Sequence, residues 1–310
     1  MAEICSCTSG IVNFGQPNCI PSFGRDSRLI FVNFSDDSGA VNSIKSTDTL
    51  DQTYFDGKFN ATDESQRWYI TDTINQVQGE RADNITQEID TIPFNVRQGN
   101  RMYDGTFYGS IAAPQFLDSL ESMSCRAMGF FIVTVKGEII GMCNKTTGDL
   151  DPIKIQRNTL QSKYMFPTAT EVQSINLKFM IEENERDSNL SFVGAENIGV
   201  DMLAQKAMST VTITVATSPA PTVTTATIDM DYLYGEKFDK IAYTGAVVGD
   251  FTLLDVNSTP VSITSVTETA TEGTYDVVYP DQTGNTPLTL SYQKTTGTGF
   301  ETVEDATITP

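Results

Sequence analysis

The residues best suited to chemistry in this sequence are three cysteines near its N-terminus. Cys5, Cys7 and Cys19 could supply three thiolates to a metal ion. Their spacing fits no common zinc pattern, and a fourth ligand is not evident. Cys125 and Cys143 bring the total to five cysteines, and an odd number in a long chain does not indicate a disulfide framework. We therefore expect no metal site, and cysteines that are reduced and either packed or exposed.

The segments Asp149-Leu150-Asp151 and Asp229-Met230-Asp231 each place two carboxylates close together. Carboxylate oxygens are ligands that calcium prefers, but neither pair has the spacing of an EF-hand loop. A glycosidase needs two carboxylates, yet Asp and Glu are spread along the whole chain and spacing selects no pair. We interpret both pairs as turn or strand-edge residues.

The sequence contains no histidine, which excludes Ser-His-Asp catalysis, Cys-His catalysis and His-ligated metals. A phosphate-binding loop is also missing, because Gly235-Glu236-Lys237 lacks the preceding glycine and the following Ser or Thr. We predict that the protein is not an enzyme and that it has no catalytic residue and no cofactor.

The chain is strongly acidic, with 20 basic and 40 acidic residues among 310 and a net charge of −20. Such a surface disfavours sequence-independent nucleic-acid binding, which needs clusters of Lys and Arg. The N-terminus lacks the positive and apolar regions of a signal peptide, and no window approaches the roughly 20 apolar residues of a membrane span. We expect no membrane partner, and a protein made in a cytoplasm.

The element around which the chain is organised runs from Pro114 to Cys143. It begins with a short amphipathic helix, because Pro114 suits a first helical turn and apolar residues recur on one face. The apolar run 129–135 and the segment 138–142, separated by Lys136-Gly137, predict a hairpin. Residues that are apolar in succession must be covered on both faces, so this hairpin belongs to the interior.

The segments before this element predict an irregular arm at 1–24, a strand at 28–34 and a helix beginning near 47–51. Strands follow near 67–78, 82–90 and 92–109, and they alternate polar with mildly apolar side chains. A sheet with one polar face exposes that face to water or to a wet channel. After the hairpin, we expect strands at 151–165, 171–183 and 211–215, with Val172 on a core face and a helical turn at 201–208.

The composition changes after residue 215. Residues 216–221 read as a short stiff linker, which divides the chain into a body at 1–215 and an outer domain at 222–310. The outer domain is rich in threonine, has 3 basic and 13 acidic residues (3 − 13 = −10), and repeats strand patterns about every ten residues. This spacing predicts a small β-sandwich of immunoglobulin type, a module that usually serves display or adhesion.

The body resembles the tail tube proteins of tailed bacteriophages. The resemblance covers about residues 1–215 and follows the order of the elements. The segments that carry it are ICSCTSGIVNFGQPNCIPSF, TLDQTYFDGKFNATDESQRWY, ERADNITQEIDTIPFNVRQGNRMYDGTFYG, APQFLDSLESMSCRAMGFFIVTVKGEIIG and PIKIQRNTL…EVQSINLKFMIEENERDSNL.

The resemblance implies a mainly β fold: a tail-tube-like β-sandwich or barrel body with a flanking α-helix, followed by the immunoglobulin-like β-sandwich. It also implies a virion protein of the phage tail, assembled in the host cytoplasm, whose copies form hexameric rings that stack head to tail. Strand pairs from each copy would build an inner barrel that conducts DNA during genome ejection without binding it specifically. Other partners would be sheath, terminator or baseplate proteins.

Acidic residues facing such a lumen would repel phosphates across a Debye length of about 8 Å. The candidates lie in the polar strands between Arg67 and Gly109, and a register slip of one residue would reverse their faces. They are Glu80, Asp83, Glu88 and Asp90.

Three other hypotheses remain open from the sequence. A capsid decoration or head-fibre protein would display the immunoglobulin-like domain and would form no filaments. A bacterial surface adhesin is disfavoured by the lack of a signal peptide. A carboxylate-based glycosidase is supported only by scattered acids.

Overall fold

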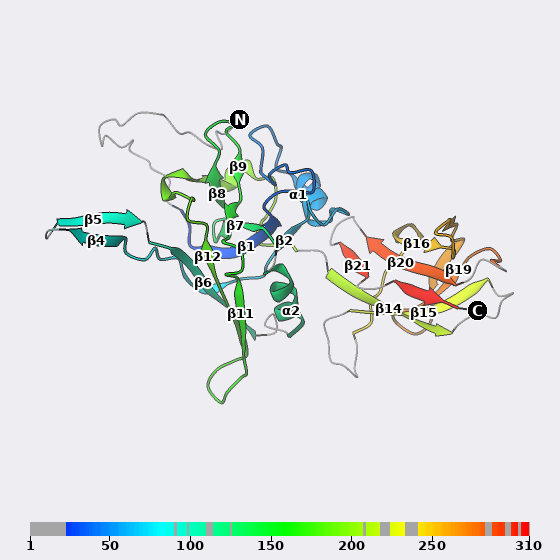
Figure 1. The fold of residues 1–310 in the computed structure, drawn as a ribbon. Helices are drawn as coiled ribbons and strands as arrows, with labels where there is room; N and C mark the ends of the chain where they lie inside the picture. The colour runs from blue at the N-terminus through cyan, green and yellow to red at the C-terminus, as the bar shows by residue number, and fades with distance from the viewer. Residues whose placement is uncertain are drawn as a thin grey trace. The chain divides into compact units, whose positions relative to one another are not determined.

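The chain divides into two compact units, Met1–Lys206 and Ala207–Pro310, in a computed structural model (Figure 1). The structure describes residues 23–89, 92–97, 99–109, 114–124, 126–206, 209–217, 224–232, 241–282, 287–294, 299–302 and 305–309. The fold is mainly β, with several antiparallel sheets and two α-helices among the described residues. The fold class expected from the sequence is therefore confirmed at this level.

Unit 1 contains a seven-stranded sheet, a four-stranded sheet and a separate two-stranded hairpin. The seven-stranded sheet consists of β1 (Asp26–Asn33), β2 (Trp68–Ile70), β7 (Met128–Thr134), β8 (Ile139–Cys143), β9 (Leu150–Asp151), β10 (Ile153–Lys154) and β13 (Leu190–Val193). The four-stranded sheet has the order β11 (Gln161–Met165), β12 (Ser174–Ile181), β6 (Arg101–Tyr108) and β3 (Asn75–Gln78), and the hairpin pairs β4 (Ile85–Ile89) with β5 (Ile92–Arg97).

The predicted interior hairpin is confirmed as β7 and β8, with Gly137 at φ 83° in the turn. Every residue of both strands is buried, because the seven-stranded sheet is covered on both faces. On one face Trp68 and Phe131 pack against each other, with ring centroids 5.2 Å apart, and α1 (Gln52–Phe59) packs beside them through Tyr54. The opposite face packs against the four-stranded sheet.

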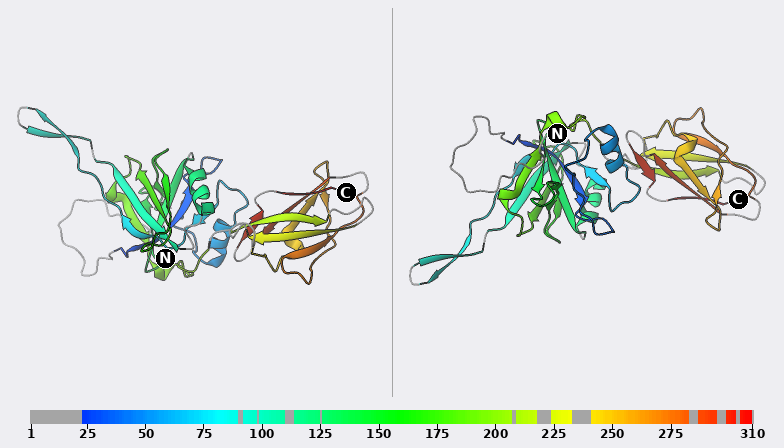
Figure 2. Two further views of the ribbon diagram at one scale, coloured as in Figure 1. Left: turned by 90° about the horizontal axis from the view of Figure 1, so that it is seen from below. Right: turned by 90° about the horizontal axis from the view of Figure 1, so that it is seen from above.

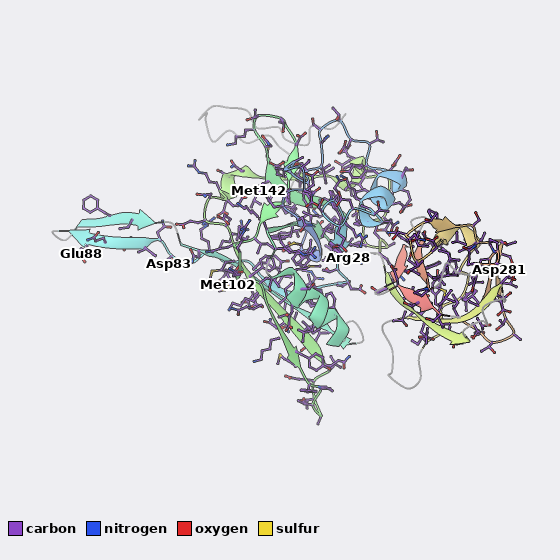
Figure 3. All side chains as sticks on the ribbon, turned by 45° about the vertical axis from the view of Figure 1, so that its right-hand side comes forward. Arg28, Asp83, Glu88, Met102, Met142 and Asp281 are labelled. Atoms are coloured by element: carbon purple, nitrogen blue, oxygen red, sulfur yellow. The ribbon has the colours of Figure 1, made fainter. Side chains whose placement is uncertain are left out.

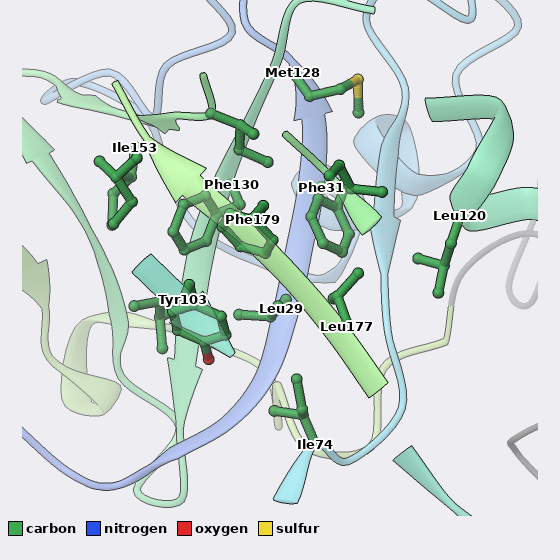
Figure 4. Packing of buried hydrophobic residues seen from close by; sticks show 14 of the residues in the cluster. Leu29, Phe31, Ile74, Tyr103, Leu120, Met128, Phe130, Ile153, Leu177 and Phe179 are labelled. Carbon is green, nitrogen blue, oxygen red and sulfur yellow. The ribbon is translucent and has the colours of Figure 1, made fainter. Parts of the chain in front are cut away.

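The core of unit 1 lies between its two sheets and is rich in aromatic rings (Figure 4). Phe179 of β12 meets Phe130 of β7 at 4.9 Å, Tyr103 of β6 at 5.1 Å and Phe31 of β1 at 6.1 Å between centroids. Edge-to-face and offset contacts of this kind stabilise beyond the area that they bury. The two sheets are thus held face to face as a β-sandwich.

Both helices begin where the sequence predicts. Asp51 caps α1, accepting a hydrogen bond from the Tyr54 N–H at 2.9 Å. The second helix, α2 (Pro114–Met123), packs on the core through Leu120, which is 1% exposed. Phe116 meets Phe107 of β6 with ring centroids 5.0 Å apart. The helix therefore covers part of the sandwich, as a lid.

Arg28 of β1 is a buried arginine that fixes the last segment of unit 1. Arg28 is only 5% exposed. Its guanidinium donates hydrogen bonds to the carbonyl oxygens of Thr71 (2.6 Å), Met202 (3.2 Å), Leu203 (2.9 Å) and Gln205 (2.6 Å). Burial lowers the pKa of the guanidinium, while Asp72 and Asp201 act in the opposite direction. One guanidinium thus supplies hydrogen-bond donors to four backbone carbonyl oxygens, three of which belong to a segment that forms no strand.

Replacing Arg28 with methionine is expected to lower the free energy of unfolding by roughly 3 kcal/mol, because it leaves two buried and two partly buried carbonyl oxygens without this donor. Chemical denaturation monitored by tryptophan fluorescence would measure the change, since the single tryptophan, Trp68, is buried in unit 1. Arg25→Met removes an exposed arginine three residues away and should change stability by less than about 0.5 kcal/mol. Equal effects of the two variants would contradict this role.

The boundary between the units lies earlier than the sequence analysis predicts. β14 (Ser209–Thr217) pairs antiparallel with β15 (Thr225–Tyr232) and parallel with β21 (Phe300–Thr302). The predicted strand 211–215 therefore belongs to unit 2 and not to the body at 1–215. Residues 216 and 217 continue that strand, and the rest of the predicted linker 216–221 lies outside the described residues.

The other strands of unit 2 follow the predicted spacing. They enclose a core that includes Ile228, Tyr243, Tyr275 and Leu290. The strands are β16 (Phe251–Leu254), β17 (Pro260–Val261), β18 (Ser265–Glu268), β19 (Thr274–Val278), β20 (Leu288–Lys294) and β22 (Ala306–Ile308). Unit 2 is thus an all-β unit, and its immunoglobulin-like character stays a prediction.

One further local prediction for unit 1 is wrong. Val172 is 59% exposed and precedes β12, so it does not point to the core as predicted. Where a helical turn is predicted at 201–208, the described residues 201–206 form one hydrogen-bonded turn, in which the Ala204 N–H donates to the Asp201 carbonyl oxygen, and residues 207 and 208 lie outside the described residues.

Candidate assembly surfaces

The four-stranded sheet has one face in the core and one polar face. Ile175, Leu177, Phe179 and Ile181 of β12 are buried, and the residues between them are partly exposed. Side chains that alternate along a strand point to opposite faces, so the pattern and register define the polar face. The described residues on it are Asn75, Gln78, Met102, Asp104, Thr106, Tyr108, Gln161, Lys163, Met165, Ser174, Asn176, Lys178 and Met180.

This polar face carries few charges, with two lysines and one aspartate. Lys178 lies opposite Asp104 in the register of β12 and β6, and the Asp104 carboxylate accepts a hydrogen bond from the Asn176 amide at 2.6 Å. The sequence predicts a polar sheet face from strands between Arg67 and Gly109, and β3 and β6 of this sheet lie in that range. The other two strands of the sheet, β11 and β12, come from later in the chain.

Both ends of this sheet are open among the described residues, because β11 and β3 each pair on one side only. The direction of the outer groups on β11 follows from the ladder. The Gly109 N–H donates to the Gln173 carbonyl oxygen at 3.0 Å, so odd-numbered residues of β12 bond to β6 and even-numbered ones to β11. Given the register of β11 with β12, Ser162 and Tyr164 direct their backbone groups toward the open edge.

The β4–β5 hairpin pairs with no other described strand and extends away from the two sheets of unit 1 (Figures 1 and 2). It continues the ladder of β3 and β6, since the Ala82 N–H donates to Asn100 and the Met102 N–H donates to Glu80. A hairpin of two strands is marginally stable in water by itself. Its conformation thus depends on its attachment and on whatever covers it.

One face of the hairpin is apolar. Gln87 lies opposite Phe94 in the register, and directly opposed side chains share a face. Ile85, Phe94 and Val96 are 49%, 50% and 61% exposed. Ile85 shares a face with Gln87 by alternation along β4, and Val96 is the extra residue of β5 where the register shifts between the pairs Ile85–Arg97 and Thr86–Asn95. Exposed apolar side chains gathered on one surface indicate an interaction site.

Three of the four predicted lumen candidates lie on this hairpin and its attachment, and not on the four-stranded sheet. Glu80 and Asp83 are exposed at the attachment, and Glu88 is exposed on β4 (Figure 3). Glu88 alternates with Gln87 along β4 and therefore lies on the face opposite to Phe94. Asp90 lies outside the described residues. Glu80, Asp83 and Glu88 lie at different points along the hairpin and its attachment. A lumenal role for them stays a prediction.

An ion-pair cluster holds the hairpin where it joins unit 1. Asp187, in the loop after β12, accepts hydrogen bonds from Arg81 at 3.0 Å and from Arg101 at 2.7 Å. The hydrogen bond from Arg81, together with the charge of Arg101, holds the pKa of the Asp187 carboxyl below its usual range. The acidic partner of Arg81 is therefore 106 residues away in the sequence.

The point where the predicted arm joins the body is also fixed. The Gly24 N–H donates to the buried Glu138 carboxylate at 2.9 Å, and the Phe23 ring meets Phe192 at 5.5 Å between centroids. Residues 1–22, which form nearly all of the predicted arm, lie outside the described residues.

The apolar face of the hairpin was missed from the sequence, although a signal for it was present. Apolar residues at 92, 94 and 96 recur every second position, and those at 85 and 89 lie four residues apart, which fits the strand period of two. Glu88, one of the lumen candidates, lies on the other face. Ser162 and Asp187 carried no such signal, because their roles depend on partners distant in sequence.

Chemistry other than assembly finds little support in the described part of the chain. There, no group of three or more His, Cys, Asp or Glu side chains could hold a metal ion. Cys143 is buried, and the other four cysteines lie outside the described residues. No described helix is long and apolar enough to cross a membrane. No protein-family model and no curated protein matches this sequence.

Proposed function

We propose that the protein is the structural subunit of a bacteriophage tail tube, which assembles from stacked rings and conducts DNA during genome ejection. The observation that carries this proposal is the four-stranded sheet with a buried face, a polar face and two open edges. An open edge presents unpaired backbone groups to another chain. Sheet continuation from β11 of one copy to β3 of the next would close a ring.

The strand count supports an open bore. Six copies of a four-stranded sheet give about 24 strands, more than the 16 to 18 strands with which barrels keep an aqueous channel. The core faces of the sheets would lie outward, against the seven-stranded sheets, and the polar faces would line the bore.

The composition of the polar face suits a conduit that does not retain DNA. Phosphate binding depends on clusters of Lys and Arg, whereas the cations among the described residues of this face are Lys163 and Lys178, and Lys178 lies opposite Asp104. The acidic candidates Glu80, Asp83 and Glu88 would add repulsion only where the hairpin itself faces the bore.

The hairpin suits the contact between rings. The apolar face of the hairpin is a different surface from the two sheet edges that would close a ring. Docking of this face on the next copy would therefore be a contact between two different surfaces of the protein. Head-to-tail contacts that do not close on themselves produce a filament. Sheath, terminator or baseplate proteins would then meet the ends or the outside of the tube.

The alternative, a capsid decoration or head-fibre protein, places the same chain elsewhere on the particle. Gold-labelled antibodies against unit 2, applied to infectious particles, distinguish the two. Labelling along the tail supports the tube subunit, and labelling confined to the head shell contradicts it.

Removing unit 2 is expected to leave tube formation intact, because no strand of unit 1 pairs with it among the described residues. The chain should end after Lys206, so that β14 leaves with its own sheet and the segment bound by Arg28 is kept. Electron micrographs should show tubes of smaller outer diameter. Loss of assembly by a truncated protein that is still folded would show that unit 2 takes part in the contacts.

A further inference from the structure

The attachment of the β4–β5 hairpin contains an unfavourable pair that one residue corrects. Arg81 and Arg101 lie directly opposite each other in the ladder, and like charges in that arrangement destabilise a strand pair. The carboxylate of Asp187 binds both. Its Oδ1 accepts from Arg81 Nη2 at 3.0 Å and from Arg101 Nη1 at 2.7 Å, and its Oδ2 accepts from Arg81 Nε at 3.0 Å.

The Arg81 guanidinium connects three parts of the chain. It donates to the Gly99 carbonyl oxygen at 3.0 Å, on the return side of the hairpin, and to the Glu185 carbonyl oxygen at 3.3 Å, in the loop of Asp187. A bidentate Arg–carboxylate contact also fixes direction, because both groups are planar. The loop after β12 is therefore joined to both strands that lead into the hairpin.

Close packing at Gly99 limits the directions in which the strands of the hairpin can leave unit 1. A Cβ atom at Gly99 would lie 1.8 Å from the Ala82 carbonyl oxygen, so only glycine permits this approach. The Gly99 N–H also donates to the Asn84 side chain at 3.3 Å. Side-chain and backbone contacts together define one direction for the strands that leave unit 1.

We propose that Asp187 is a positioning residue that fixes the direction of the β4–β5 hairpin, and that docking of the hairpin on a second copy depends on it. This inference rests on the proposed function. Among the described side chains of the hairpin, Ile85, Phe94 and Val96 are 49%, 50% and 61% exposed, and a preorganised binding element avoids the ordering cost of a mobile one.

The exposure of the Asp187, Arg81 and Arg101 side chains indicates whether this ion-pair cluster controls global stability or only the hairpin and the assembly. The Asp187 side chain is 49% exposed, and those of Arg81 and Arg101 are 17% and 24% exposed. Exposed ion pairs contribute little to global stability. A variant should therefore change the hairpin and the assembly, while the thermal midpoints of both units stay within a few degrees of the wild type.

Asp187→Asn in the full chain tests the proposal, because it keeps the size of the side chain and leaves the two arginines opposed without an acid. Hydrogen exchange of β4 and β5 amides should become faster by about fivefold or more, as expected for the loss of an ion-pair network. Tube formation, followed by light scattering, should be slower. Glu182→Gln, which removes the same charge from the same loop, is the control and should leave both measurements unchanged.

A second variant relieves the repulsion without restoring the acid. Asp187→Asn combined with Arg101→Gln should recover part of the exchange protection and part of the assembly rate. Asp187→Asn protein that exchanges and assembles like the wild type overturns the proposal. Faster exchange with unchanged assembly overturns the docking role. Wild-type protein that forms no tubes overturns the proposed function itself, and the docking role with it.

Discussion

Phe94→Asp is expected to stop tube growth while leaving single rings intact. Phe94 is half exposed on the apolar face of the β4–β5 hairpin, which pairs with no other described strand. In the tube it would be buried against the next ring, where its removal costs about 3 kcal/mol, or roughly a hundredfold in the affinity of one contact. An unpaired carboxylate in an apolar contact adds a further penalty. Each ring repeats the contact in every subunit, so the losses accumulate.

Negative-stain micrographs and sedimentation velocity would measure this outcome as rings in place of tubes. Thr86→Asp is the matched control, because Thr86 is exposed on the opposite face of the same hairpin and the substitution adds the same charge. Tubes should form normally in that variant. If Phe94→Asp protein forms tubes as the control does, the hairpin is not the contact between rings.

Ser162→Pro is expected to prevent ring formation, because β11 would lose a backbone donor at its open edge. The Ser162 N–H points away from β12, so proline keeps the β11–β12 ladder and is tolerated at an edge position. Each missing hydrogen bond between subunits costs about 1 kcal/mol, and the proline ring obstructs the approach of the neighbouring strand. Repeated at every interface of a ring, this loss should leave single subunits at concentrations where the wild type assembles.

Ser162→Ala separates the backbone effect from the side-chain effect. The Ser162 hydroxyl is buried, and no hydrogen-bond partner for it occurs among the described residues. Alanine removes that hydroxyl and keeps the N–H, so rings and tubes should form as in the wild type. Analytical ultracentrifugation of the two variants gives the comparison. Equal assembly by both would mean that β11 does not lie at the interface between subunits.

The elements that the sequence predicted best are those whose patterns are local. The consecutive apolar residues of β7 and β8 and the Lys136-Gly137 turn define a buried hairpin, and Asp51 caps α1 as the expected start signal. In unit 2, turn residues at regular intervals mark most of the strands. In each case the physical cause, a turn, a cap or a two-sided burial, lies within a few residues.

Features that depend on distant partners could not be predicted in this way. The strand 211–215 was assigned to the body because the Pro-rich segment follows it, but pairing with β15 and β21 places it in unit 2. The four-stranded sheet joins β3 and β6 to strands that follow about 60 to 100 residues later. The role of Asp187 likewise arises from arginines 86 and 106 residues away.

Electron microscopy of the purified protein tests the central claim most directly. The proposal predicts hollow tubes of stacked rings, in which β11 of each copy continues the sheet through β3 of its neighbour around the bore. A protein that stays a single globule at high concentration, or that forms rings in which these edges do not meet, would contradict it.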